Sequence, residues 1–223
     1  MFPAGISAVI FDLDGTLVDS AGEIHAALAA AFSERGIEPL SKPEVEGLIG
    51  RGVSSLVQRA LAIRGAGSTG VDEAVEAFEA HYAREVGSRA ALFPGVPEGL
   101  RMLHAAGCKL AVVTNKPRAF TEALLAKLDI LGAFVATVAG DDGVARKPAG
   151  DMLAAACAAM GTKPGETLML GDSETDVRAA RAAGCPVWCV PYGYNEGRDP
   201  ATLACDRMVA TVEEAARLLL AAV

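Results

Sequence analysis

The stretch that decides the fold reads Ile6-Ser7-Ala8-Val9-Ile10-Phe11-Asp12-Leu13-Asp14-Gly15-Thr16. Its apolar first half predicts a short buried strand. Two carboxylates, Asp12 and Asp14, follow that strand at once, and Gly15 lets the backbone turn and approach a ligand closely. Ligands of an open α/β sheet bind beyond the carboxyl ends of its strands, where such an acidic loop suits a hard divalent cation. A plain helix cap by an aspartate is the alternative interpretation of this loop.

Further short apolar runs occur later in the chain, and helical stretches of about ten residues separate them. The expected strands are 6–11, 110–113, 134–138, 167–170 and 187–190, and the expected helices between and after them are 120–128, 151–160, 174–183 and 212–220. Apolar strands that alternate with helices are typical of a parallel sheet with helices on both faces. The sequence therefore predicts an α/β fold with a Rossmann-like parallel sheet as its core.

One long interval, between residues 16 and 92, breaks this alternation. Amphipathic helices are expected there over 23–35, 52–63 and 72–86, joined by turn-rich linkers at 36–42 and 65–70, and no strand pattern appears. A helical insertion after the first strand is the simplest account, and Phe93-Pro94-Gly95-Val96-Pro97 marks the return to the sheet. We expect a catalytic core at 1–16 and 92–223 and an all-α cap at 17–91 that selects the substrate.

Polar segments stand at the ends of the later strands as well. Thr114 and Asn115 follow one strand, and hydroxyl, amide and free N–H groups at such a place can hold phosphate oxygens. Lys147 precedes a helix and supplies a compact positive charge. Asp172 and Asp176 follow another strand, one helical turn apart. Taken singly, turn capping explains the first pair and each aspartate, and Lys147 could be an ordinary surface lysine.

The order of these segments is more specific than any one of them. Asp-x-Asp-Gly-Thr, then Thr114, then Lys147, then Gly-Asp-x-x-x-Asp at residues 171–176 resembles the haloacid dehalogenase superfamily, with all four of its motifs in order. The resemblance spans nearly the whole chain. The insertion after the first strand is similar to the all-helical cap that the superfamily carries between its first two motifs.

The resemblance implies an aspartyl-phosphate mechanism. Asp12 would be the nucleophile, and Asp14 would protonate the leaving oxygen and then activate water. Gly15 would lie against the substrate in the same loop. Mg²⁺ would be held by Asp12, the backbone carbonyl of Asp14, and Asp172.

The remaining motif residues would handle the charge of the phosphoryl group. Thr114 and the Asn115 amide would bind phosphate oxygens, and Lys147 would stabilise the charge on the nucleophile and on the phosphoryl group. Asp176 would orient the metal shell or Lys147. Such a set supplies the positioning and charge neutralisation that phosphoryl transfer needs.

Departures from the pattern separate the chemistries of the superfamily. Dehalogenating members lack the second aspartate, whereas Asp14 is present here, so the site is expected to be directed at phosphate. Phosphonate-cleaving members use a cap lysine to form a Schiff base. The only lysine between residues 17 and 91 is Lys42, which lies in a linker, so phosphonate cleavage is disfavoured. The segments Gly50-Arg51-Gly52-Val53 and Tyr192-Gly193-Tyr194-Asn195 resemble segments of phosphoglycolate phosphatases. Arg51 could meet a substrate carboxylate, or could be a solvated arginine, and the tyrosines could equally form a packed loop.

We therefore expect a Mg²⁺-dependent phosphatase of small phosphomonoesters, with 2-phosphoglycolate as the substrate. The alternatives are a phosphatase of a sugar phosphate, a phosphomutase similar to β-phosphoglucomutase, and a non-catalytic binding protein on the same fold. The intact Asp12, Asp14, Lys147 and Asp172 argue against the last of these.

Composition excludes several other classes of protein. The chain has 223 residues and a formal net charge of −8, which argues against a nucleic-acid partner. It contains neither a long uncharged apolar run nor a signal-peptide pattern, so we expect no membrane partner and a cytoplasmic location. The five cysteines form no CxxC pair and are expected to be reduced. Whether the protein is a monomer or a dimer is left open by the sequence.

Overall fold

The core of the computed structural model, which describes residues 5–67 and 70–221, is a parallel sheet. Its strands lie in the order β5-β4-β1-β6-β7-β8, and each adjacent pair is parallel. Their bounds are β1 Ala8–Phe11, β4 Lys109–Val113, β5 Ala136–Val138, β6 Thr167–Gly171, β7 Val187–Cys189 and β8 Arg207–Met208. Because β1 is central, its carboxyl end lies between the carboxyl ends of β4 and β6.

Helices cover both faces of this sheet, and β1 shows why. Ala8 and Ile10 belong to one buried cluster, with side chains of α7 and α8, whereas Val9 and Phe11 belong to the other, with side chains of α5, α6 and α9. Both faces are apolar because successive strand residues point to opposite sides. The bounds of these helices are α5 Val96–Ala105, α6 Arg118–Lys127, α7 Asp151–Met160, α8 Glu174–Ala183 and α9 Val212–Leu220.

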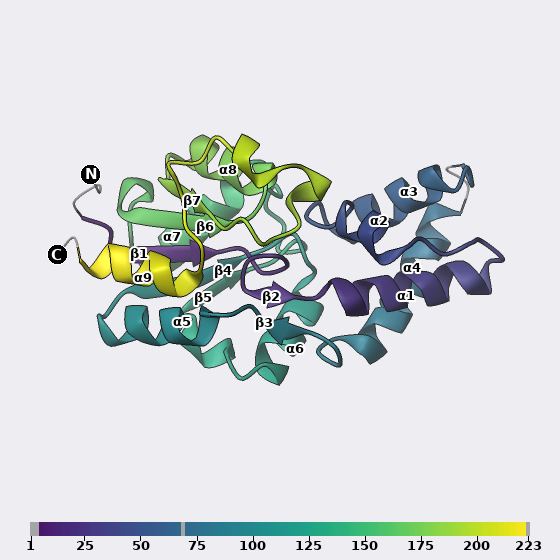
Figure 1. The fold of residues 1–223 in the computed structure, drawn as a ribbon, viewed down its shortest axis with the longest axis horizontal. Helices are drawn as coiled ribbons and strands as arrows, with labels where there is room; N and C mark the ends of the chain where they lie inside the picture. The colour runs from purple at the N-terminus through teal and green to yellow at the C-terminus, as the bar shows by residue number, and fades with distance from the viewer. Residues whose placement is uncertain (1–4, 68–69, 222–223) are drawn as a thin grey trace.

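The segment between β2 and β3 is helical and extends away from the sheet (Figure 1). Strands β2 (Val18–Asp19) and β3 (Ala91–Leu92) pair antiparallel at its base. The helices are α1 Ala21–Glu34, α2 Lys42–Glu46, α3 Val53–Ile63 and α4 Val71–Glu85. Side chains such as Leu28 and Phe32 of α1 and Phe78 of α4 are buried, and they belong to the same apolar cluster as Val9 and Phe11 of β1. Among the described helices, none has the length and apolar character needed to cross a membrane.

These elements agree closely with the predicted fold class. Helices α7, α8 and α9 begin and end where the pattern places them, and the other predicted helices and strands differ by one or two residues at their ends. The sequence pattern did not indicate β2, β3, β8, α2 or α5. The first four are only two to five residues long, which is too short to establish a period. Helix α5 has ten residues, but Pro97 and Gly99 lie in its first turn and weaken the helical signal. Short 3₁₀ turns complete the fold: η1 Leu131–Ala133, η2 Pro164–Glu166, η3 Asn195–Gly197 and η4 Pro200–Thr202.

Candidate active site

Polar residues gather where three neighbouring strands end. Asp12 follows β1, Thr114 follows β4, and Asp172 follows β6. Strand β1 pairs with both of the others, so these three positions lie side by side at one edge of the sheet. All three residues are buried. The edge is therefore a compact polar site behind an apolar core, as expected for a ligand site in an open parallel sheet.

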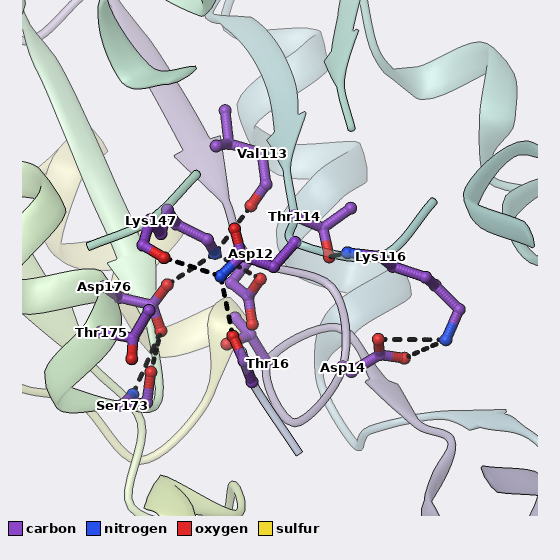
Figure 2. A network of polar contacts seen from close by, with 12 residues as sticks. Asp12, Asp14, Thr16, Val113, Thr114, Lys116, Lys147, Ser173, Thr175 and Asp176 are labelled. Carbon is purple, nitrogen blue, oxygen red and sulfur yellow. Dashed lines mark hydrogen bonds and ion pairs between the residues drawn. The ribbon is translucent and has the colours of Figure 1, made fainter. Parts of the chain in front are cut away.

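Lys147 lies at the centre of this site (Figure 2). Its Nζ is 2.6 Å from Asp12 Oδ1 and 2.7 Å from Asp176 Oδ1, and it donates to the carbonyl oxygen of Val113 at 2.9 Å. These contacts use all three N–H donors of the ammonium group. Burial alone would lower the pKa of Lys147, but the charges of Asp12 and Asp176 raise it above its usual value. Lys147 is thus held as a cation beside Asp12.

Three buried carboxylates share this single positive charge. Oxygen atoms of Asp12, Asp172 and Asp176 lie within 4.8 Å of one another. Burial, together with the charges of the neighbouring aspartates, raises the pKa of Asp12 and raises that of Asp172 to about 7. Three carboxylates against one ammonium leave two negative charges when all are ionised. A hard divalent cation would offset that excess, so the residues present fit such an ion.

Helix α8 fixes the position of Asp176. The Asp176 Oδ2 atom accepts from the backbone N–H of Asp172 and of Ser173, each at 3.2 Å, and from the Ser173 hydroxyl at 2.8 Å. These contacts form a capping box that satisfies the free N–H groups at the start of the helix. One oxygen of Asp176 therefore anchors the helix, and the other holds Lys147 in place.

Asp14 forms an ion pair that was not predicted from the sequence. Lys116 Nζ lies 2.9 Å and 3.0 Å from the two carboxylate oxygens of Asp14, and the Ser20 hydroxyl donates to Asp14 Oδ1 at 2.6 Å. The Lys116 ammonium also lies over the ring of Tyr82, 4.7 Å from its centroid. Lys116 follows Thr114 and Asn115 directly in the chain, so its charge was the available signal.

Gly15 brings the first loop close to Asp172. Its φ is +96°, in the left-handed region that favours glycine. A Cβ atom at this position would lie 2.6 Å from Asp172 Oδ2, well inside van der Waals contact. The loop after β1 can therefore approach the loop after β6 only with glycine here.

Thr114 and Asn115 differ in what their side chains do. The Thr114 hydroxyl accepts from the backbone N–H of Lys116 at 3.2 Å. Asn115 Nδ2 donates to the carbonyl oxygens of Gly50 and Lys147, both at 2.9 Å. The Asn115 side chain thus joins the helical segment to the core, and any contact that Asn115 makes with a substrate is left to its backbone N–H.

A cavity of about 500 Å³, including its open mouth, lies between the helical segment and the sheet edge. On the sheet side its wall contains Asp12, Asp14, Thr114, Asn115 and Lys116. On the helical side the wall is mostly apolar, and it comprises Ile24, Ile49, Gly50, Gly52, Val53, Leu56, Phe78 and Tyr82, with Phe120 of α6 completing it. The site is therefore polar where a phosphate would meet Asp12 and apolar around the remainder of a ligand.

Arg51 lies next to this cavity, against the loop that follows β7. Its Nε and Nη2 donate to the two carboxylate oxygens of Glu196 at 3.0 Å and 2.6 Å. The Thr175 hydroxyl donates to the same carboxylate at 2.9 Å. Arg51 shares a neighbouring hollow with Lys147 and Arg198. In this structure the guanidinium is thus paired within the protein, and its predicted contact with a substrate carboxylate stays a prediction.

The segment Tyr192-Gly193-Tyr194-Asn195 links the site to the base of the helical segment. The Tyr194 hydroxyl accepts from the N–H groups of Ser20 and Ala21, both at 2.9 Å, and donates to Asp19 Oδ1 at 2.8 Å. The Tyr194 N–H donates to Asp172 Oδ2 at 2.8 Å. One residue thus contacts both the start of α1 and a carboxylate of the site, so this segment is more than a packed loop.

The structure brings most of the predicted residues to one place. Asp12, Asp14, Thr114 and Asn115 line the cavity. Behind them, Lys147, Asp172 and Asp176 lie next to Asp12, and Gly15 lies against Asp172. Arg51 points instead to Glu196. No site role was predicted for Lys116, Glu196 or Tyr82, because the position of each depends on a partner far away in the chain.

Comparison with known proteins agrees with this geometry. The family model of haloacid dehalogenase-like hydrolases matches residues 6–184. The phosphoglycolate phosphatase of Nitrosospira multiformis is 41% identical over 221 residues, covering 98% of this chain and 97% of the relative. That of Thiobacillus denitrificans is 40% identical over 223 residues, with the same coverage.

Solved structures show the same arrangement. The crystal structure of a predicted phosphoglycolate phosphatase from Haemophilus somnus superposes with a TM-score of 0.92 at 28% identity, covering 98% of this chain and all of the other. A second phosphoglycolate phosphatase-like structure, from Lactobacillus delbrueckii, gives 0.88 at 27% identity over 96% and 98% of the two chains. The chain therefore belongs to the haloacid dehalogenase-like hydrolases.

Proposed function

We propose that the protein is a Mg²⁺-dependent phosphatase that hydrolyses 2-phosphoglycolate. The observation that carries this proposal is the pairing of Asp12 with Lys147 at the polar end of the cavity, with Asp14 beside it. The two relatives at about 40% identity that bear the name phosphoglycolate phosphatase support the choice of substrate.

Asp12 acts as the nucleophile. One of its carboxylate oxygens attacks phosphorus, and the bond between phosphorus and the ester oxygen breaks, which leaves an aspartyl-phosphate on Asp12. Lys147, 2.6 Å from Asp12 Oδ1, offsets the repulsion between the carboxylate and the anionic phosphate. Asp176 keeps Lys147 in place through its contact at 2.7 Å.

Asp14 acts as the general acid and base. It gives its proton to the ester oxygen as that oxygen leaves with glycolate, and it then takes a proton from the water that attacks the aspartyl-phosphate. This second step releases inorganic phosphate and restores both carboxyl groups. Ser20 and Lys116 orient the Asp14 side chain toward the cavity that holds the ester oxygen.

The transferring phosphoryl group needs neutralisation on its remaining oxygens. The Thr114 hydroxyl, the Asn115 N–H and the backbone of Gly15 are the donors that we assign to it. Asp12, the backbone carbonyl of Asp14, and Asp172 are the groups that would hold Mg²⁺. When bound, the ion would supply charge compensation between the carboxylates and the phosphate.

Residues 17–91, which contain the helical segment, are proposed as a cap on a core formed by 1–16 and 92–223. This cap supplies the apolar wall of the cavity, so its closing would exclude water from the phosphoryl group until the second step. Such a small-metabolite phosphatase is expected to work in the cytoplasm.

A phosphate-release assay tests this proposal. Purified protein with Mg²⁺ is offered 2-phosphoglycolate, a panel of sugar phosphates and p-nitrophenyl phosphate. We expect the highest kcat/KM for 2-phosphoglycolate. A higher kcat/KM for a sugar phosphate would make that ester the substrate instead. Isomerisation of β-glucose 1-phosphate without phosphate release would indicate a phosphomutase. If no ester is turned over, the proposal that the protein is a phosphatase is refuted.

A further inference from the structure

The cavity raises the question of what balances the second charge of a small anionic ester. In 2-phosphoglycolate a carboxylate stands one methylene group away from the ester oxygen. The wall opposite the sheet edge is built mainly from apolar side chains such as Ile49, Leu56 and Phe78. A carboxylate buried there without a cation would lose its hydration with nothing to replace it.

Two of the basic side chains near the site are already engaged. All three N–H groups of the Lys147 ammonium donate hydrogen bonds, to Asp12, to Asp176 and to the carbonyl oxygen of Val113. Arg51 forms a two-pronged ion pair with Glu196. Among the described residues that line the cavity, Lys116 is the basic one.

Lys116 is held where such a carboxylate would lie. Its Nζ is 2.9 Å and 3.0 Å from the oxygens of Asp14, the residue that we assign to the ester oxygen. A cation one hydrogen bond away from that acid is well placed to reach a group one methylene away from the ester oxygen. An ammonium has three N–H donors, and these two contacts use two of them.

Buried contacts fix this lysine from the side of the helical segment. The Tyr82 ring lies under its ammonium, and the Tyr82 hydroxyl donates to Glu23 Oε1 at 2.7 Å. Glu23 is fully buried, and its other oxygen accepts from the Gly87 N–H at 2.7 Å. The position of Lys116 is therefore set by α1 and α4 as well as by its own loop, which preorganises it for a ligand.

We propose that Lys116 binds the carboxylate of the substrate and so sets the preference for phosphomonoesters that carry a carboxylate next to the ester oxygen. This inference rests on the proposed function, because it assigns a residue to the non-reacting end of that substrate. It gives to Lys116 the role for which the sequence suggested Arg51.

The test compares two esters of similar size in one pair of variants. 2-Phosphoglycolate carries the carboxylate, and 2-hydroxyethyl phosphate replaces it by a neutral hydroxymethyl group. The variants are Lys116→Met, which removes the charge, and Lys116→Gln, which keeps a polar group beside Asp14. Lys109→Met, at the opposite end of β4 and bonded to the Met160 carbonyl, is the matched control. Urea unfolding of each variant confirms that it is folded.

The readout is the ratio of kcat/KM for the two esters, because loss of the contact with Asp14 lowers turnover of both. We expect both Lys116 variants to lower this ratio by about 10- to 100-fold, the range for a hydrogen bond to a charged group, and Lys109→Met to leave it unchanged. An unchanged ratio in the Lys116 variants, or a wild type without preference for the carboxylate, would overturn this inference alone. A wild type that hydrolyses neither ester would overturn the proposed function itself.

Discussion

Replacing Glu196 by Gln is expected to weaken closure of the helical segment over the site. The Glu196 carboxylate receives two hydrogen bonds from Arg51 in that segment and one from Thr175 in the core. The Gln side chain has nearly the same shape but carries no charge. Arg51 is 46% exposed and can turn to water when its partner is lost, so the substitution tests the ion pair without leaving a buried cation.

The size of the effect follows from the geometry. Exposed ion pairs contribute about 0.2–1 kcal/mol, and the exposure of Arg51 places this pair in that class. The contact is two-pronged, and the Glu196 side chain is only 5% exposed, so we place this ion pair at the upper end of that energy range. We expect a coupling of about 1 kcal/mol, which corresponds to roughly a fivefold shift in the closing equilibrium.

The assay is a cycle of Arg51→Met, Glu196→Gln and the double variant, with KM measured for 2-phosphoglycolate and for p-nitrophenyl phosphate. If the pair acts as a clasp, each single variant raises both KM values by about fivefold, and the double variant adds nothing further. Asp206→Asn breaks the two-pronged pair with Arg181, which lies wholly in the core, and is expected to leave both KM values unchanged.

A selective result would refute this reasoning. If Arg51→Met raises KM for 2-phosphoglycolate alone while Glu196→Gln has no effect, Arg51 contacts the substrate carboxylate, as its sequence context suggested. The pH dependence adds a check. Burial would raise the pKa of Glu196, but Arg51 and Thr175 outweigh it and hold the pKa below its usual 4.5. The stability that the pair contributes is therefore complete above pH 4.5 and lost as the pH falls below it, and Arg51→Met should flatten that loss in urea unfolding.

Other changes probe the chemistry and the loop after β7. Asp12→Asn should abolish phosphate release because an amide is a poor nucleophile, and appreciable residual turnover would remove Asp12 from that role. EDTA should stop turnover and Mg²⁺ should restore it, as followed by released phosphate; turnover that persists in EDTA contradicts the metal assignment. Tyr194→Phe leaves the Ser20 and Ala21 N–H groups without their acceptor and should lower the free energy of unfolding by about 1–3 kcal/mol in urea titration, whereas a change near zero would mean that water replaces the hydroxyl.

Much of the fold could be predicted because the relevant signals are local. The unbroken apolar run Ala8-Val9-Ile10-Phe11 indicates a strand that is buried on both faces, and helices α7 to α9 carry a full helical period. Elements shorter than one period carry no such signal. Strands β2 and β3 form because their positions on either side of the helical segment meet in space, which only the fold decides.

The site divides along the same line. The sequence predicts that Asp12, Thr114 and Asp172 lie together, because each follows a strand of one parallel sheet. In such sheets, ligand sites lie beyond the carboxyl ends of the strands. The choice of partner for a flexible side chain follows no such rule. The Arg51 side chain could contact solvent, a ligand or any nearby carboxylate. Its partner Glu196 is 145 residues further along the chain, and only the fold brings the two together.

Lys116 shows how this limit shapes the interpretation of function. Its type and its place after Thr114 and Asn115 were visible in the sequence, but a lysine in a loop after a strand is usually solvated. In the structure Lys116 is buried instead, between Asp14 and the Tyr82 ring. Its ammonium group has therefore lost hydration, which costs free energy. That cost is offset in the free protein by Asp14, and a substrate carboxylate would offset it again at the moment of binding. The proposed role of Lys116 in binding the substrate carboxylate thus follows from its buried position beside Asp14 and Tyr82, and not from a sequence motif.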